Sequence, residues 1–232
     1  MANVMRTCDL SVSYNGTPAL ESVSVSIPAR GTTAVTGPSG CGKSTLLKCL
    51  NGLIDEDPSA QVSGERFLDE RPFESWKAKD LRKRVGLVFQ NPTPFPFSIE
   101  KNLTCVVAYH SPKRPAKSEM DRQVRELLET VGLWSEVRNH LGKSALELSG
   151  GQMQRLCIAR ALAVQPDVLL LDEPCSALDA HSTETIEDLV MRLSRDRAVV
   201  LVTHNLDQAR RVADHEIRLR AGRVAKNRGG DR

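Results

Sequence analysis

The 232-residue sequence has no long hydrophobic run. Its longest apolar stretches, residues 168–171 and 198–202, have the length of strands, whereas a membrane-spanning helix needs about 20 apolar residues. The first ten residues contain neither an apolar core segment nor a small-residue cleavage pattern, so they predict no export signal. With 40% apolar and 26% charged residues, the composition indicates a soluble globular protein that associates with a membrane only through a partner.

Paired cysteines and a strong excess of one charge are also missing. No CxxC pair or zinc-type spacing is present, which predicts reduced cysteines that serve mostly for packing. The 32 basic and 29 acidic side chains give a formal net charge of +3, and this near balance argues against a dedicated nucleic-acid binder. No segment recurs at about 20–50 residues, so a repeat architecture is excluded. The cysteines are Cys8, Cys41, Cys49, Cys105, Cys157 and Cys175.

Two kinds of strand pattern occur along the chain. Residues 5–27 alternate between apolar and polar side chains, which predicts antiparallel strands with one wet face in a small β-subdomain. Residues 32–36, 168–171 and 199–202 are β-branched or continuous apolar runs, typical of a parallel sheet that is covered on both faces. Residues 119–131 carry an apolar stripe at helical spacing. We therefore expect an α/β core with an antiparallel β-subdomain and a helical insertion.

The segment from Asn91 to Phe97 contains three prolines and two aromatic residues. Proline is excluded from helix interiors and from central strands, so this segment is expected to be a stiff exposed loop. Exposed aromatic side chains on a stiff loop indicate a docking surface. We expect residues 91–147 to form the inserted helical subdomain of a single domain that spans residues 1–232.

Residues 37–45 read GPSGCGKST and fit the pattern GxxxxGK[ST] between a strand and a helix-forming run. Glycines allow the backbone to bend so that N–H groups and the helix N-terminus face an anion. Lys43 is expected to reach the β- and γ-phosphates, and the Ser44 hydroxyl to bind Mg²⁺. An accidental glycine-rich turn would lack the flanking strand and helix. The predicted nucleotide-binding residues are Gly37, Pro38, Ser39, Gly40, Cys41, Gly42, Lys43, Ser44 and Thr45.

The apolar run 168–171 ends in two carboxylates, Asp172 and Glu173. In an open α/β sheet, ligands bind at the carboxyl ends of the strands. Asp172 is expected to hold Mg²⁺ directly or through water, and Glu173 to orient and deprotonate the water that attacks the γ-phosphorus. Without the phosphate loop, a helix-capping role for the two acids would be as good an interpretation, although Pro174 disfavours it.

Residues 148–152 read LSGGQ and precede a helical run over 153–164, with Ser149 at or near the N-cap. The two glycines expose backbone N–H groups at the positive end of a helix, which predicts a second anion site without a lysine. Taken alone, such a turn is usually only a cap. Together with the phosphate loop and the strand that ends in two acids, it resembles the ABC ATPase family.

This resemblance implies a P-loop NTPase core of the ABC cassette type, with ATP and Mg²⁺ as its ligands. Tyr14 resembles the aromatic residue that stacks on adenine, Gln90 the lid glutamine, residues 176–179 the D-loop, and His204 the switch histidine. His204 follows an apolar strand and so belongs at the same sheet edge as Glu173. The implied catalytic residues are Glu173, His204 and Gln90, the metal ligands are Ser44, Gln90 and Asp172, and the second nucleotide-binding set is Ser149, Gly150, Gly151 and Gln152.

The resemblance also implies partners. In this family two chains pack head to tail, and each ATP lies between one chain's phosphate loop and the other chain's residues 149–152. We therefore expect a homodimer with ATP at its interface, bound to two integral membrane permease subunits at the cytoplasmic face of the cell membrane. An extracytoplasmic phosphate-binding protein would join through the complex, and no nucleic acid is expected.

The runs at residues 37–53, 85–103 and 148–179 resemble the phosphate-import ATPases of the Pst type. The expected function is ATP hydrolysis that powers uptake of inorganic phosphate. Cys175 and Ala180 depart from that subfamily, which more often has Thr and Pro there, and residues 227–232 are expected to be a disordered tail.

Several alternatives follow from the family. Since a cassette does not touch the transported solute, a cassette for phosphonate, another oxyanion or an amino acid remains open. DNA-repair ABC ATPases insert a very long coiled coil, for which residues 91–147 are too few. Ribosome-acting ABC proteins carry two cassettes in one chain, and this sequence contains one set of motifs.

Overall fold

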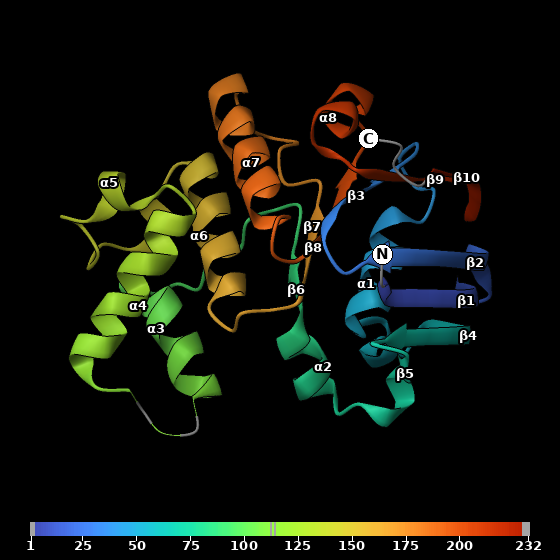
Figure 1. Ribbon diagram of the computed structural model, residues 1–232, viewed down its shortest axis with the longest axis horizontal. Coiled ribbons are helices and arrows are strands. Elements are labelled where there is room, and N and C mark those ends of the chain that lie inside the picture. The colour runs from blue at the N-terminus through green and yellow to red at the C-terminus, as the bar shows by residue number, and fades with distance from the viewer. Residues whose placement is uncertain (1–2, 112, 114, 229–232) are drawn as a thin grey trace.

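The computed structural model describes residues 3–111, 113 and 115–228, and their strands form two sheets (Figure 1). The antiparallel sheet has the order β2-β1-β4-β5, and the core sheet has the order β10-β9-β3-β8-β7-β6. The strands are β1 (Asn3–Tyr14), β2 (Thr17–Pro28), β3 (Gly31–Thr36), β4 (Ala60–Leu68), β5 (Arg71–Pro72), β6 (Val85–Val88), β7 (Val168–Asp172), β8 (Ala198–Thr203), β9 (His215–Arg220) and β10 (Arg223–Arg228).

The core sheet is buried on both faces. Strands β3, β8, β7 and β6 pair in parallel, so successive side chains point to opposite faces. Val168 and Leu170 pack with α1 (Lys43–Asn51) and the antiparallel sheet. Leu169 and Leu171 pack with the helices on the other face. The parallel-sheet runs predicted at 32–36, 168–171 and 199–202 are thereby confirmed as β3, β7 and β8.

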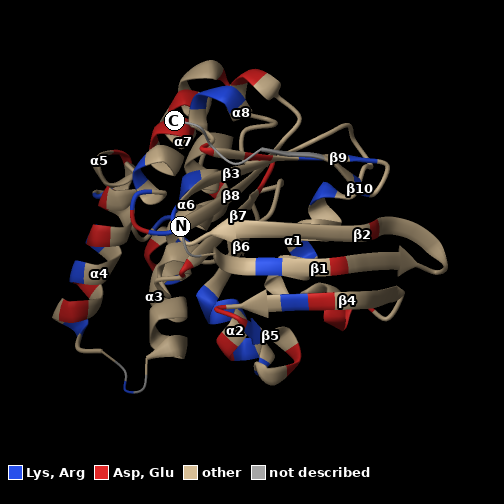
Figure 2. Ribbon diagram, turned by 45° about the vertical axis from the view of Figure 1, so that its right-hand side comes forward, with Lys and Arg blue, Asp and Glu red and all other residues tan. Residues whose placement is uncertain are grey.

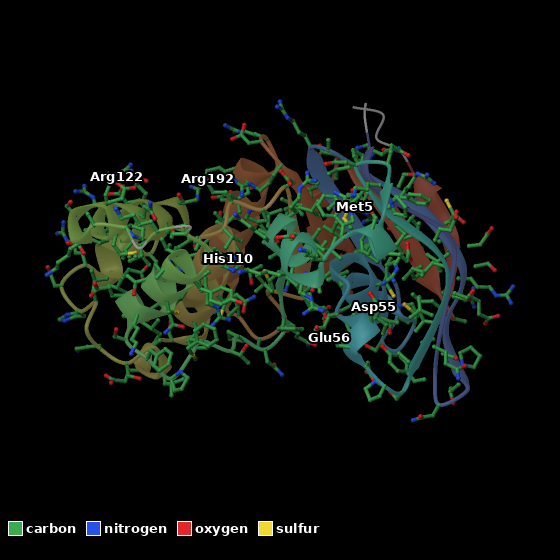
Figure 3. The ribbon with its side chains drawn as sticks, turned by 90° about the horizontal axis from the view of Figure 1, so that it is seen from below. Met5, Asp55, Glu56, His110, Arg122 and Arg192 are labelled. Atoms are coloured by element: carbon green, nitrogen blue, oxygen red, sulfur yellow. The ribbon has the colours of Figure 1, made fainter. Side chains whose placement is uncertain are left out.

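Helices cover the second face of the core sheet and extend beyond it (Figure 1). The predicted helix over 119–131 is confirmed as α4, which buries Met120, Val124 and Leu128 and carries charges of both signs on its exposed side (Figure 2). Arg122 on that exposed side lies far from Asp55 and Glu56, which lie beside α1 (Figure 3). The remaining helices are α2 (Ala78–Arg84), α3 (Ile99–His110), α4 (Lys117–Thr130), α5 (Trp134–Val137), α6 (Gly150–Leu162), α7 (Ala180–Leu193) and α8 (Leu206–Val212), with 3-10 turns at Ile54–Glu56, Phe73–Ser75 and Ala145–Glu147.

The structure corrects two boundaries. The helix predicted over 153–164 begins earlier, at Gly150, and ends at Leu162. The tail predicted to be disordered from Asn227 is wrong for residues 227 and 228, because their backbones pair with β9 and extend the sheet. Residues 229–232 lie outside the described residues.

Two further features concern cysteines and membranes. All six cysteines are free, and Cys41, Cys49 and Cys157 are buried, in line with the predicted packing role. Within the described part of the chain, no helix combines the length and apolar character that crossing a membrane requires.

Candidate functional site

The phosphate loop connects the end of β3 to the start of α1. Within this loop, Gly42 is the N-cap of α1 and provides no side-chain cap, so the first N–H groups of the helix point out of the helix end. At Gly37 a Cβ atom would lie 2.3 Å from the carbonyl oxygen of Leu219. At Gly40 a Cβ would meet nothing within 4 Å. The loop is therefore packed against the protein on one side and open on the other, as an anion cradle requires.

Lys43 lies inside this loop, and its side chain is 5% exposed. Its ammonium group donates hydrogen bonds to the carbonyl oxygens of Gly37 at 2.9 Å and Pro38 at 3.0 Å. The same nitrogen is 3.6 Å from Oε1 of Glu173. The lysine charge is thus held between the phosphate loop and the carboxyl end of β7.

Asp172 ends β7 beside the first turn of α1. Burial raises the pKa of Asp172, and the neighbouring charge of Glu173 adds to the rise. A hydrogen bond with Ser44 lowers this pKa but does not cancel the effect of burial. Its Oδ1 atom is buried and has no hydrogen-bond partner, although buried polar atoms are nearly always paired. A buried carboxylate oxygen next to a hydroxyl suits Mg²⁺, which prefers oxygen ligands. Among the described residues, no group of three or more His, Cys, Asp and Glu side chains is arranged to hold a metal ion.

Glu173 is the centre of the site. Its φ angle is +43°, in the left-handed region that side chains other than glycine rarely adopt. Such backbone costs about 1–3 kcal/mol and is concentrated at functional sites. The conformation places Oε2 2.9 Å from Nδ1 of His204 while Oε1 faces Lys43. The prediction that His204 and Glu173 share one sheet edge is confirmed, because β7 and β8 are parallel neighbours.

Two predicted residues lie at the border of this group. Gln90 follows β6, is exposed, and donates from Nε2 to the Ser176 hydroxyl at 3.3 Å, which links it to the predicted D-loop. No hydrogen bond joins Gln90 to Asp172 or Ser44 in the described structure. Tyr14 is half-buried at the tip of the β1–β2 hairpin.

The second predicted anion-binding loop is a complete helix cap. The Ser149 hydroxyl accepts from the Gln152 N–H at 3.3 Å, and the Gln152 side chain accepts from the Ser149 N–H at 3.0 Å. Ser149 and Gly150 are exposed, whereas Gly151 is buried, where a Cβ would lie 2.8 Å from the Ser182 hydroxyl. This confirms the N-cap prediction for Ser149.

The two loops lie apart within one chain. Helix α1, which follows the phosphate loop, packs on one face of the core sheet, whereas α6, which follows Ser149, packs on the other (Figure 1). One chain therefore presents two separate half-sites, each with N–H groups at a helix start.

The proline-rich loop exposes its aromatic residues as predicted. Phe95 and Phe97 are 40% and 41% exposed, and Arg160 lies over the Phe95 ring at 4.3 Å. Beside them is a cavity of about 340 Å³ lined by this loop, β6, α3 and α6.

Two residues at this surface were not predicted from the sequence. Asn102 is fully buried and holds the loop, since its side chain accepts from the Phe95 N–H at 2.7 Å and donates to the Ser98 carbonyl at 3.0 Å. The second residue is Phe89, an aromatic side chain that is 44% exposed. A polar residue one turn into a helix after a proline-rich loop could have indicated Asn102.

Comparisons with known proteins agree with this geometry. A family profile described as ABC transporter matches residues 20–176. The chain is 49% identical over 207 residues to phosphate import ATP-binding protein PstB 3 of Streptococcus pneumoniae, covering 88% of this chain and 82% of that protein. It is 46% identical over 230 residues to PstB 2 of Synechococcus sp., covering 98% and 85%.

Two solved structures share the fold at 28% identity and a TM-score of 0.83. One is a dimeric ATP-binding cassette in a post-hydrolysis state bound to ADP and Pi, and the match covers 97% of this chain and 98% of that one. The other is cbiO1 of Clostridium perfringens, part of the ABC transporter complex cbiONQ, where the match covers 98% and 88%.

Proposed function

The chain belongs to the ABC transporter family, and we propose that it is the ATP-binding and ATP-hydrolysing subunit of an importer of inorganic phosphate. The observation that supports the ATPase function is the position of the Glu173 carboxylate, which lies between Lys43 and His204. The preceding residue, Asp172, has a buried Oδ1 without a hydrogen-bond partner. The phosphate assignment is supported by the two PstB relatives, both phosphate import proteins by name.

In this proposal each side chain has one task in hydrolysis. Lys43 exchanges its bonds to the loop carbonyls for bonds to phosphate oxygens, and the N–H groups at the start of α1 bind the same phosphates. Glu173 orients the attacking water and accepts its proton, while His204 holds the carboxylate through Oε2. Ser44 and Asp172 hold Mg²⁺, which when bound offsets the negative charge of the phosphates. Gln90 and Tyr14 border the site as lid residue and adenine contact.

The working unit in this proposal is a dimer. Because α1 and α6 lie on opposite faces of the core sheet, residues 149–152 of one chain serve the phosphate loop of a second copy. The exposed Gly150 leaves backbone N–H groups accessible to that nucleotide. The dimeric cassette with ADP and Pi supports this arrangement.

We further propose that residues 91–147 are the inserted helical subdomain of a single ABC ATPase domain. The loop at residues 91–97 and its 340 Å³ cavity would receive cytoplasmic segments of two permease subunits, which places the chain at the cytoplasmic face of the membrane. The transporter complex that contains cbiO1 supports a permease partner. A phosphate-binding protein would act from the other side of the membrane.

The test is co-purification with candidate phosphate permease subunits, followed by ATPase assays in membranes with and without phosphate-loaded binding protein. Stimulation by the loaded protein that Glu173→Gln abolishes is the expected result. An active ATPase indifferent to phosphate would refute the substrate and favour phosphonate, another oxyanion or an amino acid. A Glu173→Gln chain that keeps its ATPase activity would refute the catalytic site.

A further inference from the structure

A polar network with a buried centre joins α7 to α8, which pack together (Figure 2). Glu187 of α7 and Gln208 of α8 are 8% and 4% exposed. Gln208 donates from Nε2 to Oε1 of Glu187 at 3.1 Å. Arg211 binds both carboxylate oxygens of Glu187, at 2.7 Å and 2.9 Å. Burial raises the pKa of the Cys175 thiol, and the nearby Gln208 amide opposes that rise.

The ends of this network lie next to the reacting pair along the chain. Cys175 follows Glu173 by two residues, and Gln208 follows His204 by four. Between His204 and Gln208, Asn205 caps α8 by accepting from the Gln208 N–H at 3.0 Å. Gln208 is thus bonded through its backbone to the residue that follows His204, and through its side chain to Glu187 of α7.

Helix α8 is short and packs against α7, β3 and β8. It contains seven residues, and its buried apolar side chains are those of Ala209 and Val212. An isolated helix of this length is unstable in water, so tertiary contacts must hold it. A buried hydrogen bond has a narrower geometry than an apolar contact and specifies one arrangement. The hydrogen bonds to Glu187 therefore fix α8 against α7, and His204 lies two residues before this helix.

We propose that Gln208, anchored by Glu187, is a positioning residue that holds the His204 imidazole against the Glu173 carboxylate. The inference rests on the proposed ATPase function and is independent of the transported solute. In the described part of the chain no hydrogen bond joins Gln208 to His204, so an effect of Gln208 on hydrolysis would pass through the position of α8 and of His204.

The experiment is a double-mutant cycle between Gln208→Leu and His204→Ala. Leucine keeps the buried volume and removes the hydrogen bond to Glu187. We expect kcat to fall by about tenfold or more, because small misplacements of catalytic groups are costly, with KM for ATP unchanged. In the His204→Ala background, Gln208→Leu should lower kcat no further. An equal fall in both backgrounds, or an unchanged kcat in the single variant, would overturn the inference.

A second variant and a second readout cover failure to fold or to hydrolyse. Glu187→Gln keeps the acceptor for Gln208 and weakens the bond to Arg211, so it should give a smaller fall in kcat with the same dependence on His204. The imidazole NMR signals of His204 should shift in Gln208→Leu and stay in place in the control Arg210→Gln, whose exposed pair with Asp207 lies on the same helix. Unmoved His204 signals in Gln208→Leu would overturn the positioning role, whether or not the wild-type chain hydrolyses ATP. An inactive wild-type chain would refute only the ATPase proposal.

Discussion

The two glycine-rich loops at residues 37–45 and 149–152 use the same physical device in different surroundings. Both expose N–H groups at the start of a helix. The phosphate loop also contains a buried lysine and faces the carboxylates that end β7. The loop at Ser149 has a capping box and no lysine, and its Ser149 and Gly150 are exposed. Our proposal accounts for this difference: the first loop binds the nucleotide that is cleaved, and the second completes a site on another copy.

The largest expected effect separates chemistry from binding at the first loop. Glu173→Gln removes the proton acceptor and keeps the side-chain shape, so kcat should fall by at least about 100-fold. ATP affinity should change little. Steady-state ATPase assays and nucleotide titration test this, with Glu184→Gln on the exposed side of α7 as the matched control. Rapid phosphate release by Glu173→Gln would contradict the role of the carboxylate.

The next effect contrasts the two loops in nucleotide binding. Lys43→Ala removes a charge-assisted hydrogen bond, and ATP affinity of the monomer should weaken by about tenfold or more. Ser149→Ala should leave that affinity unchanged and lower helix stability by about 1 kcal/mol. Titration with a fluorescent ATP analogue at low protein concentration measures both. Equal losses from the two substitutions would mean that both loops serve one chain's nucleotide.

A pair of glycine substitutions sharpens the comparison within the second loop. Gly151→Ala brings a Cβ 2.8 Å from the Ser182 hydroxyl and should destabilise the fold by about 1–3 kcal/mol. At Gly150 the only atom near an added Cβ is 3.8 Å away, on Leu178. Gly150→Ala should stabilise the helix by up to about 1 kcal/mol and yet reduce ATPase activity, because a second copy's nucleotide needs that space. Denaturant unfolding and ATPase assays on both variants decide this, and full activity of a stable Gly150→Ala chain would contradict it.

The smallest effect is a pH dependence near the second loop. Although burial raises the pKa of Glu136, hydrogen bonds from Arg155 and Gln152 outweigh burial and hold this pKa below its usual range. The stabilisation is present above the unfolded-state pKa of about 4.3 and is lost as the pH falls through the lower folded-state pKa. Glu136→Gln should therefore lower stability at neutral pH and flatten its dependence on acid. Unfolding measured between neutral and acid pH tests this, and parallel curves for the two chains would exclude it.

Sequence reasoning succeeded where a motif is continuous in the chain. The phosphate loop is one stretch between a strand and a helix, so its geometry could be predicted. The meeting of Glu173 and His204 followed from one rule, that parallel strands end at a common edge. The prediction that the two loops serve different nucleotide sites rested on the family resemblance, because no local pattern indicates which face of a sheet a helix covers.

Other features could not be predicted because distant segments create them. Glu187, Gln208 and Arg211 are ordinary polar residues until α7 and α8 pack together. Strand β4 was not predicted because Gly64 interrupts its apolar pattern. The backbone of Gly64 passes so close to Asp9 that an added Cβ would lie 2.4 Å from the Asp9 carbonyl oxygen.

The central claim is that each nucleotide site is divided between two copies of this chain. The most direct measurement is light scattering of the Glu173→Gln chain with and without ATP, which hydrolysis can no longer remove. The account predicts a monomer without ATP and a dimer with ATP, and no ATP-dependent dimer when Lys43→Ala is added. A chain that binds ATP and remains monomeric at high concentration would contradict it.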